Sequence, residues 1–189
     1  MGRRALLLSV LLPAIARAEP AWGLEALMAE LRGVRASSAR FVEKQHLRML
    51  TEPLQSSGRL AYVAPDRLWK ETLEPRPARM AVEGDRLMVQ LPGEAAREMS
   101  LREQPEIGAL VASIRSTLAG DLPALRRYYA VSLEGGRADW RLALQPLDAR
   151  LRSMIASIVI SGSGAAVRFV ETRSAEGDRT EMTILPDDR

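Results

Sequence analysis

The side chains that come nearest to acid–base or metal chemistry in this sequence are a lone histidine and a pair of adjacent aspartates. The chain has one histidine, His46, and no cysteine, so it offers no thiol nucleophile and no histidine-based metal site. Alternation along the surrounding segment places His46 beside Lys44 and Arg48 on a charged face, where we expect a solvated imidazole. Asp187 and Asp188 stand near the C-terminal end, and we expect solvated carboxylates there.

The sequence motifs of common enzyme classes are also missing. There is no glycine-rich phosphate loop, no GxSxG or HExxH motif, and no set of carboxylates at metal-ligand spacing. We therefore expect no enzyme activity, no metal and no cofactor. A hydrolase that uses carboxylates alone is the catalytic alternative, and loss of turnover on replacing one carboxylate would reveal it.

Apolar side chains spaced two apart can bind an apolar ligand, and residues 56–92 carry a series of them. Breaks rich in proline, glycine and aspartate divide this stretch into short strands, which we place at residues 58–63, 67–73, 78–82 and 87–91. Within these strands, apolar residues mostly alternate with charged ones. The pattern predicts an antiparallel meander with one apolar face and one solvated face.

The rest of the chain supplies two helices and more strands. Apolar residues at three- and four-residue spacing predict amphipathic helices over residues 21–34 and 105–118. A long first strand is predicted over residues 39–50, with Phe41, Leu47 and Met49 facing inward. Further strands are predicted at residues 95–101, 129–133, 140–145, 154–160, 166–172 and 180–185. The sum is a mainly β fold with α: a curved antiparallel sheet of about eleven strands that forms an open, incomplete β-barrel, covered by the N-terminal and mid-chain helices.

The N-terminal segment has the features of an export leader. Met1–Arg4 is charged, Ala5–Ile15 is an apolar run, and Ala16–Ala18 is a small-x-small cleavage site. The apolar run is shorter than the roughly 20 residues that span a bilayer. We expect a signal peptide over residues 1–18, cleaved in the cell, and a single domain over residues 19–189 located outside the cytoplasm.

Removing the leader changes the charge balance. The chain has 27 basic and 24 acidic residues, and Arg3, Arg4 and Arg17 leave with the leader, so 24 of each remain. A balanced charge gives no support for a nucleic-acid partner. Because the chain has no cysteine, the exported domain has no disulfide and must be stabilised by apolar burial.

The helices are expected to leave part of the concave face of the sheet unfilled, as an apolar cavity under a lid. The cargo-binding cavity is predicted to be lined by Phe41, Leu60, Tyr62, Trp69, Met80, Val82, Leu87, Val89, Trp140, Leu142, Ile158 and Phe169. The lid is predicted to carry Ile107, Leu110, Val111 and Ile114. Such a cavity suits an acyl chain, because burying each methylene contributes about 0.8 kcal/mol.

The order of these elements resembles a known family. The matching segments are F-V-E at 41–43, S-G-R-L at 57–60, P-D-R-L-W-K-E at 65–71, E-G-D-R-L at 83–87, D-W-R-L-A-L-Q-P at 139–146 and I-A-S-I-V-I at 155–160. Together they resemble the periplasmic outer-membrane lipoprotein carriers of LolA type, over nearly the whole chain after the leader. The resemblance implies an open β-barrel closed by helices, which takes the acyl chains of a lipoprotein or other lipid from an inner-membrane transporter and passes them to an outer-membrane acceptor. We expect a monomer.

One position departs from the family pattern. Such carriers usually have an arginine immediately before the proline of the central turn, where it helps to hold the lid, and this chain has Ala64 there. The nearby Arg67 is a candidate substitute. The alternative function is a lipid-sensing periplasmic module of the same fold, in which lipid occupancy controls contact with a membrane-anchored regulator.

Overall fold

The computed structural model describes residues 22–187, and the expected leader lies outside the described residues. The helices are α1 (Leu24–Arg32), α2 (Pro105–Leu118), α3 (Leu122–Leu125) and α4 (Ala149–Arg152). The strands are β1 (Ala36–His46), β2 (Leu54–Val63), β3 (Arg67–Glu74), β4 (Ala78–Glu83), β5 (Arg86–Gln90), β6 (Arg97–Ser100), β7 (Tyr129–Gly136), β8 (Asp139–Pro146), β9 (Ile155–Ser163), β10 (Ala166–Ser174) and β11 (Arg179–Pro186). Within residues 22–187, no helix has both the length and the apolar character needed to cross a bilayer.

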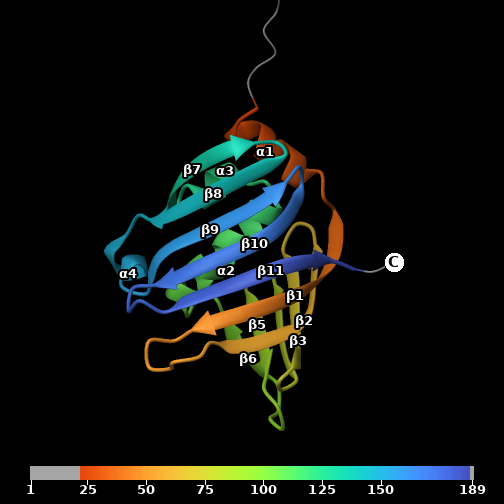
Figure 1. Cartoon of the computed structure of the whole chain (residues 1–189), viewed down its shortest axis with the longest axis vertical. Coiled ribbons are helices and arrows are strands. Elements are labelled where there is room, and N and C mark those ends of the chain that lie inside the picture. The colour runs from red at the N-terminus through yellow and green to blue at the C-terminus, as the bar shows by residue number, and fades with distance from the viewer. Residues whose placement is uncertain (1–21, 188–189) are drawn as a thin grey trace, which may run out of the picture.

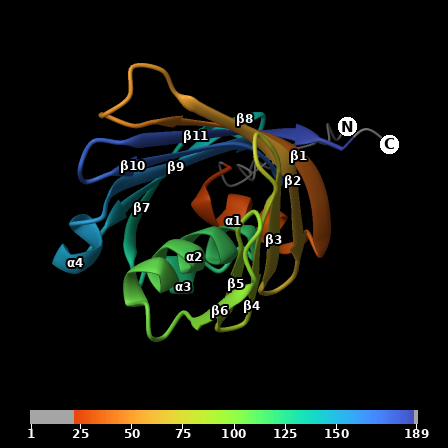
Figure 2. The ribbon, with the colours of Figure 1, turned by 90° about the horizontal axis from the view of Figure 1, so that it is seen from below.

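The strands form one 11-stranded sheet in the order β6-β5-β4-β3-β2-β1-β11-β10-β9-β8-β7. Each neighbouring pair is antiparallel, and β1 pairs with both β2 and β11, so strands from the two ends of the chain lie side by side in the middle of the sheet (Figure 1). The sheet curves around α1, α2 and α3 without closing, because β6 and β7 remain its edges (Figure 2). This confirms the predicted mainly β fold with an open barrel and helices inside it.

The first strand is shorter than predicted. β1 ends at His46, and a turn follows in which the Leu50 amide donates to the Leu47 carbonyl at 2.9 Å. Met49 lies in this turn and is 86% exposed, so the prediction that it faces inward is wrong. The sequence alternates through the turn as it does through the strand, and alternation alone did not show where the ladder ends.

Helix α1 packs closely against the end of α2. Its inward stripe is Leu27, Met28 and Leu31, all buried. At the other side of the contact, Gly120 has a φ of +62°, and a Cβ there would lie 2.0 Å from the Met28 carbonyl oxygen, which only glycine avoids. The Arg32 guanidinium donates to the Gly120 carbonyl at 2.7 Å. The C-terminal end of α2 is therefore fixed to α1.

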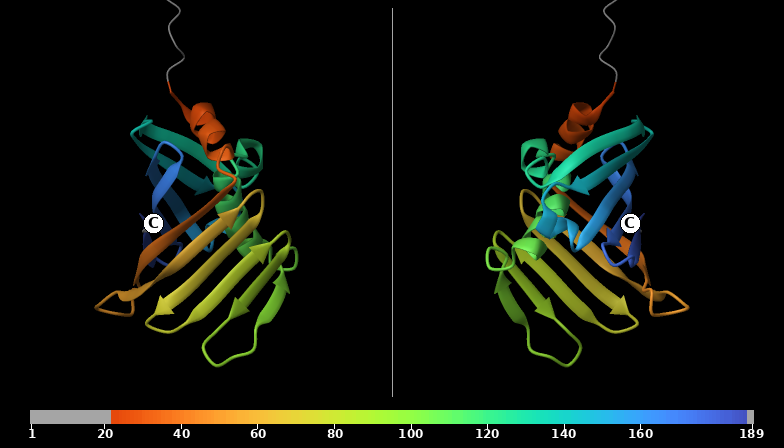
Figure 3. Two further views of the ribbon diagram at one scale, coloured as in Figure 1. Left: turned by 90° about the vertical axis from the view of Figure 1, so that its right-hand side faces the viewer. Right: turned by 90° about the vertical axis from the view of Figure 1, so that its left-hand side faces the viewer.

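The buried core forms two clusters on the concave side of the sheet. The larger one comprises Leu27, Met28, Leu31, Ala109, Leu122, Leu125, Tyr129, Trp140, Leu142, Leu144, Leu151, Ile155, Ile158 and Ile160. The smaller one comprises Val82, Leu87, Leu101 and Val111. We call the part of the sheet formed by β7–β10 with α1 the packed half, and the part formed by β2–β6 the open half (Figure 3). Helix α2 contributes to both clusters and so lies between the halves.

Candidate lipid-binding site

The strand register shows which side chains share the concave face. Residues directly paired in an antiparallel ladder point to the same side of the sheet. Ile160, in the larger core cluster, pairs with Val170; Val170 pairs with Met182, and Met182 pairs with Glu43. Glu43 and Phe41, two residues apart on β1, therefore face the same side as the helices.

The packed half of the concave face is filled by the protein's own side chains. Trp140 and Leu142 are 0% exposed and Ile158 is 1% exposed. The Trp140 indole Nε1 donates to the Gly164 carbonyl at 2.8 Å, and a Cβ on Gly162 would lie 2.5 Å from the indole ring. The sequence correctly placed Trp140, Leu142 and Ile158 inward, but here they pack against α1 and the other core residues.

Part of the open half lies beneath α2. Tyr62, Val82 and Leu87 are 3–4% exposed, and Val82 and Leu87 cluster with Val111 of the helix. Burial raises the pKa of the Tyr62 phenol, and its hydroxyl has no hydrogen-bond partner among the described residues. Val82 and Leu87 are therefore covered by α2, and Tyr62 is buried in the same row of the sheet.

The neighbouring row of the open half is more exposed, although Val89 at one end of it also packs on the smaller cluster. It consists of Leu60, Lys70, Met80 and Val89, which pair in succession across β2, β3, β4 and β5. We call this row the open strip. Met80 is 42% exposed, and the other members are half-buried. The predicted lining residues Leu60, Met80 and Val89 therefore share one accessible, largely apolar row.

A polar cluster adjoins the open strip, and sequence reasoning missed it. The Lys70 ammonium lies 2.7 Å from Glu43 Oε2 and 4.9 Å from the centre of the Phe41 ring. Gln45 Nε2 donates to Glu43 Oε1 at 3.0 Å, and the Ser56 hydroxyl lies 3.4 Å from the same oxygen. Phe41 is thus inward, as predicted, but it contacts a lysine. Phe41 and Glu43 are two residues apart on β1, so the sequence alone could have shown that they face the same side of the sheet.

Two predicted lining residues lie on the opposite, convex face. Trp69 adjoins Lys70 on β3, and because Lys70 is concave-facing, the Trp69 ring points outward. On β10 the register shifts between Val167 and Phe169. Val167 and Val170 both pack on the larger core cluster, so Phe169 faces away from it. The prediction that Trp69 and Phe169 line the concave face is therefore corrected.

The predicted lid residues of α2 divide between the two halves. Ile107 and Val111 belong with the smaller cluster, and Leu110 packs on the larger one. Ile114 is 38% exposed and belongs to neither cluster. Helix α2 thus places apolar side chains in both the packed half and the open half.

Hydrogen bonds tie α2 and its preceding loop to the β4–β5 hairpin. The Arg115 guanidinium donates to the Gly84 carbonyl. Asp85 accepts a hydrogen bond from the Ser100 hydroxyl at 2.7 Å and pairs with Arg102 at 3.4 Å. Arg67, the candidate substitute for the missing arginine, pairs instead with Glu83 at 2.7 Å. Arg115 therefore makes a polar contact between α2 and the β4–β5 hairpin.

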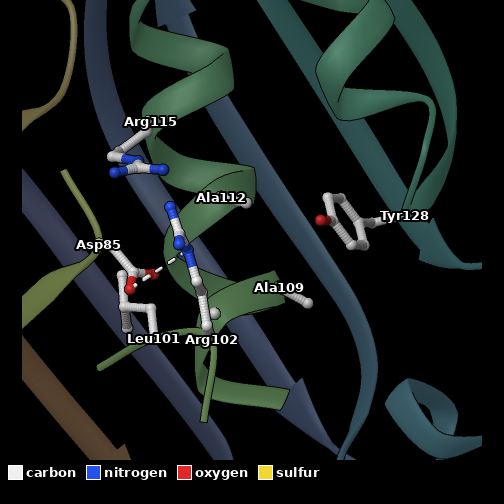
Figure 4. Close-up of a pocket in the computed structure, with 8 residues that line it drawn as sticks. Asp85, Leu101, Arg102, Ala109, Ala112, Arg115 and Tyr128 are labelled. Atoms are coloured by element: carbon white, nitrogen blue, oxygen red, sulfur yellow. Dashed lines mark ion pairs between the residues drawn. The ribbon is translucent and has the colours of Figure 1, made fainter. Parts of the chain in front are cut away.

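A hollow of about 260 Å³ lies beside α2, bounded by Arg102, Arg115, Asp85 and Tyr128 among others (Figure 4). Its volume is below the roughly 300–1,000 Å³ typical of ligand pockets, and charged side chains line it. This hollow is not the apolar cavity expected from the sequence.

The lone histidine lies beside a carboxylate and an arginine on the convex face. His46 Nε2 lies 3.1 Å from Glu181 Oε2, and Arg179 lies 3.3 Å from the other oxygen of the same carboxylate. The His46 side chain is 35% exposed, so it is only partly solvated. Within residues 22–187, no three His, Cys, Asp or Glu side chains are grouped so that they could hold a metal ion.

The family model described as "outer membrane lipoprotein carrier protein LolA-like" matches residues 16–187. The chain belongs to this family. The LolA-like fold is similar to the crystal structure of a LolA superfamily protein from Nitrosomonas europaea, at 10% identity and a TM-score of 0.42, covering 89% of this chain and 96% of that one. It is also similar to a putative outer membrane lipoprotein-sorting protein domain from Vibrio parahaemolyticus, at 14% identity and a TM-score of 0.44, covering 86% and 89%. No curated protein gives a significant match to this LolA-like chain.

Proposed function

We propose that this LolA-like protein is a periplasmic carrier, which shelters the acyl chains of a lipoprotein or other lipid and shuttles them from an inner-membrane transporter to an outer-membrane acceptor. The observation that carries the proposal is the open strip. Leu60, Met80 and Val89 form an accessible apolar row on the inner side of the sheet, directly beside the row that α2 covers. A carrier needs such a surface and needs no catalytic group.

The energetics of acyl transfer require a sheltering surface of this kind. Exposing a chain of about 16 carbons to water costs on the order of 12 kcal/mol, at about 0.8 kcal/mol per methylene. Unassisted crossing of an aqueous compartment is therefore very slow. In our proposal the open strip, which Lys70 interrupts, and the row beneath α2 together give a largely apolar surface for the chain once the helix is displaced.

The contacts that hold α2 in place suggest how the helix moves. Its C-terminal end is held by the close contact of Gly120 with Met28 and by the Arg32 hydrogen bond. Toward the open half it is held by the small cluster around Val111 and by Arg115. In our proposal α2 pivots about its C-terminal end, and Val82 and Leu87 become available to the cargo.

The proposal is tested by binding of a fluorescent C16 acyl probe to the purified protein lacking residues 1–18. We expect saturable binding, and we expect Val89→Glu to raise the Kd by at least about tenfold, because the acyl chain would have to desolvate a carboxylate. Met88→Glu is the matched control, because Met88 adjoins Val89 on β5 and points to the other face. Absence of saturable binding, or equal effects of the two variants, would contradict the proposal.

The proposed compartment has its own test. If residues 1–18 are a cleaved leader, the protein recovered from the periplasmic fraction begins at Glu19, and intact-mass measurement shows the loss of that segment. Recovery in the cytoplasm with the full N-terminus would contradict the periplasmic assignment.

A further inference from the structure

The ion pair of Lys70 and Glu43 occupies an unfavourable place for a structural ion pair. The Glu43 side chain is 5% exposed and the Lys70 side chain 26% exposed, on a concave face whose other members are largely apolar. Taking paired charges out of water costs free energy, and apolar replacements of such pairs are often as stable or more stable. Stability alone therefore does not explain an ion pair at this position, and we look for its role in ligand binding.

The two charges are arranged at different depths. The Glu43 carboxylate is the more deeply buried of the two groups, and Gln45 and Lys70 donate hydrogen bonds to its oxygens at 3.0 and 2.7 Å. Lys70 on β3 reaches past β2 to Glu43 and to the ring of Phe41 on β1. A ligand on the open strip therefore meets the positive end of the pair first.

The apolar neighbours of Lys70 lie on either side of it within one row. Leu60 and Met80 are its direct partners on β2 and β4. The row beneath α2, with Val82 and Leu87, is the adjacent one. An amphiphile can thus place its chain along the apolar side chains and its head at Lys70.

We propose that Lys70, held by Glu43, is the subsite for the negatively polarised head of the cargo, so that the ligand class is an acyl lipid whose head presents anionic oxygen, as a carboxylate or a phosphate. This rests on the proposed carrier function and names the ligand of that same site. Glu43 weakens the attraction between Lys70 and the anionic head, because it neutralises part of the charge that Lys70 presents to the head.

The test compares binding of C16 probes that share one chain length and differ in the head: palmitate, hexadecyl phosphate and hexadecyltrimethylammonium. The decisive pair of variants is Glu43→Gln and the double variant Glu43→Gln/Lys70→Met. The double variant removes both charges and so leaves no buried charge unpaired. Lys44→Met on the convex side of β1 is the matched control.

We expect opposite effects of the two variants on the anionic probes. Glu43→Gln is expected to lower their Kd, and the double variant to raise it by about tenfold, the effect of losing one charge-assisted hydrogen bond. The cationic probe should bind the double variant at least as well as the parent. Palmitate and hexadecyl phosphate both have an unbranched C16 chain and differ in the anionic head group, so their relative Kd values distinguish a carboxylate from a phosphate head.

The possible failures are distinguishable. If the parent protein binds none of the C16 probes, the carrier function itself fails. If it binds them and both variants shift all probes in the same direction, or neither variant shifts any, then the ion pair is structural and the head-group proposal is overturned. Circular dichroism and thermal melting of each variant separate loss of folding from loss of binding.

Discussion

The two halves of the concave face use the same kind of sheet in different ways. In the packed half, α1 and α2 press against β7–β10, and Trp140, Leu142 and Leu144 are 0% exposed. In the open half, α2 covers one row of side chains, and the next row, with Met80 at 42% exposure, is more exposed. One half resembles an ordinary protein core, and the other retains apolar surface.

The difference indicates a division between stability and function. Removing a side chain from a close-packed interior leaves a cavity, whereas removing a half-exposed side chain does not. Regions with few buried contacts also open at lower free energy than the core. We therefore expect the packed half to determine whether the protein folds, and the open half to determine what it binds.

The largest expected effect comes from truncating the central side chain of the packed half. Trp140→Ala should lower the free energy of unfolding by about 3–5 kcal/mol, because it empties the space against Gly162 and removes the hydrogen bond to Gly164. Met80→Ala, on the open strip, should cost less than about 1 kcal/mol. Denaturant titration of both variants measures the contrast, and costs of similar size would contradict the division between the halves.

The contact of α2 with the open half should be the weaker of its two attachments. Arg115→Met removes the hydrogen bond to the Gly84 carbonyl and should cost about 1 kcal/mol. We expect faster amide exchange in α2 and in the β4–β5 hairpin, with exchange in β8 and β9 unchanged. Arg127→Met, at an exposed position beyond α3, is the control. Uniformly faster exchange in both halves would argue against α2 as a separately opening lid.

The smallest expected effect concerns two tyrosines, one in each half. Burial raises the pKa of both Tyr129 and Tyr62 above the ordinary value of 10.0. The unfolded chain then loses these protons at lower pH than the folded one, so the stability due to the neutral phenols is present below pH 10 and is lost as the pH rises beyond it.

Replacement of each tyrosine by phenylalanine checks this pH dependence. Tyr129→Phe and Tyr62→Phe should each flatten the fall in melting temperature between pH 9 and 11. Tyr62→Phe should cost little at pH 7, because its hydroxyl has no hydrogen-bond partner among the described residues. Tyr129→Phe loses the contact of its hydroxyl with the Ala109 carbonyl at 3.4 Å. A steeper fall in either variant would show that another group controls the alkaline loss of stability.

The sequence was sufficient for the sheet and for most of its turns. Hairpin breaks such as 83–85 carry glycine where the backbone needs a positive φ, as at Gly84 with 57°, and these signals are local. The pairing of β1 with β11 is not local and was not predicted. The short helix α4 was not predicted either, because four residues after Asp148 give too little periodicity.

The sequence predicted less well which face of the sheet each side chain occupies. On β3, Leu68, Lys70 and Thr72 alternate with Trp69, Glu71 and Leu73, so each face has both apolar and polar members and the pattern does not select one.

On β10, the register shift before Phe169 reverses the alternation. The Lys70–Glu43 pair could not be predicted for a related reason, because it joins strands through a register that the sequence does not state.

The joining of β1 to β11 has a consequence for the order of assembly. The open half is made from segments early in the chain and the packed half largely from segments after residue 128, and within the sheet they are joined at this one seam. A chain still being synthesised lacks β11 and cannot join the two parts of the sheet. The sheet can therefore be completed only after residues 179–186 have left the ribosome, so its central strands are among the last to pair.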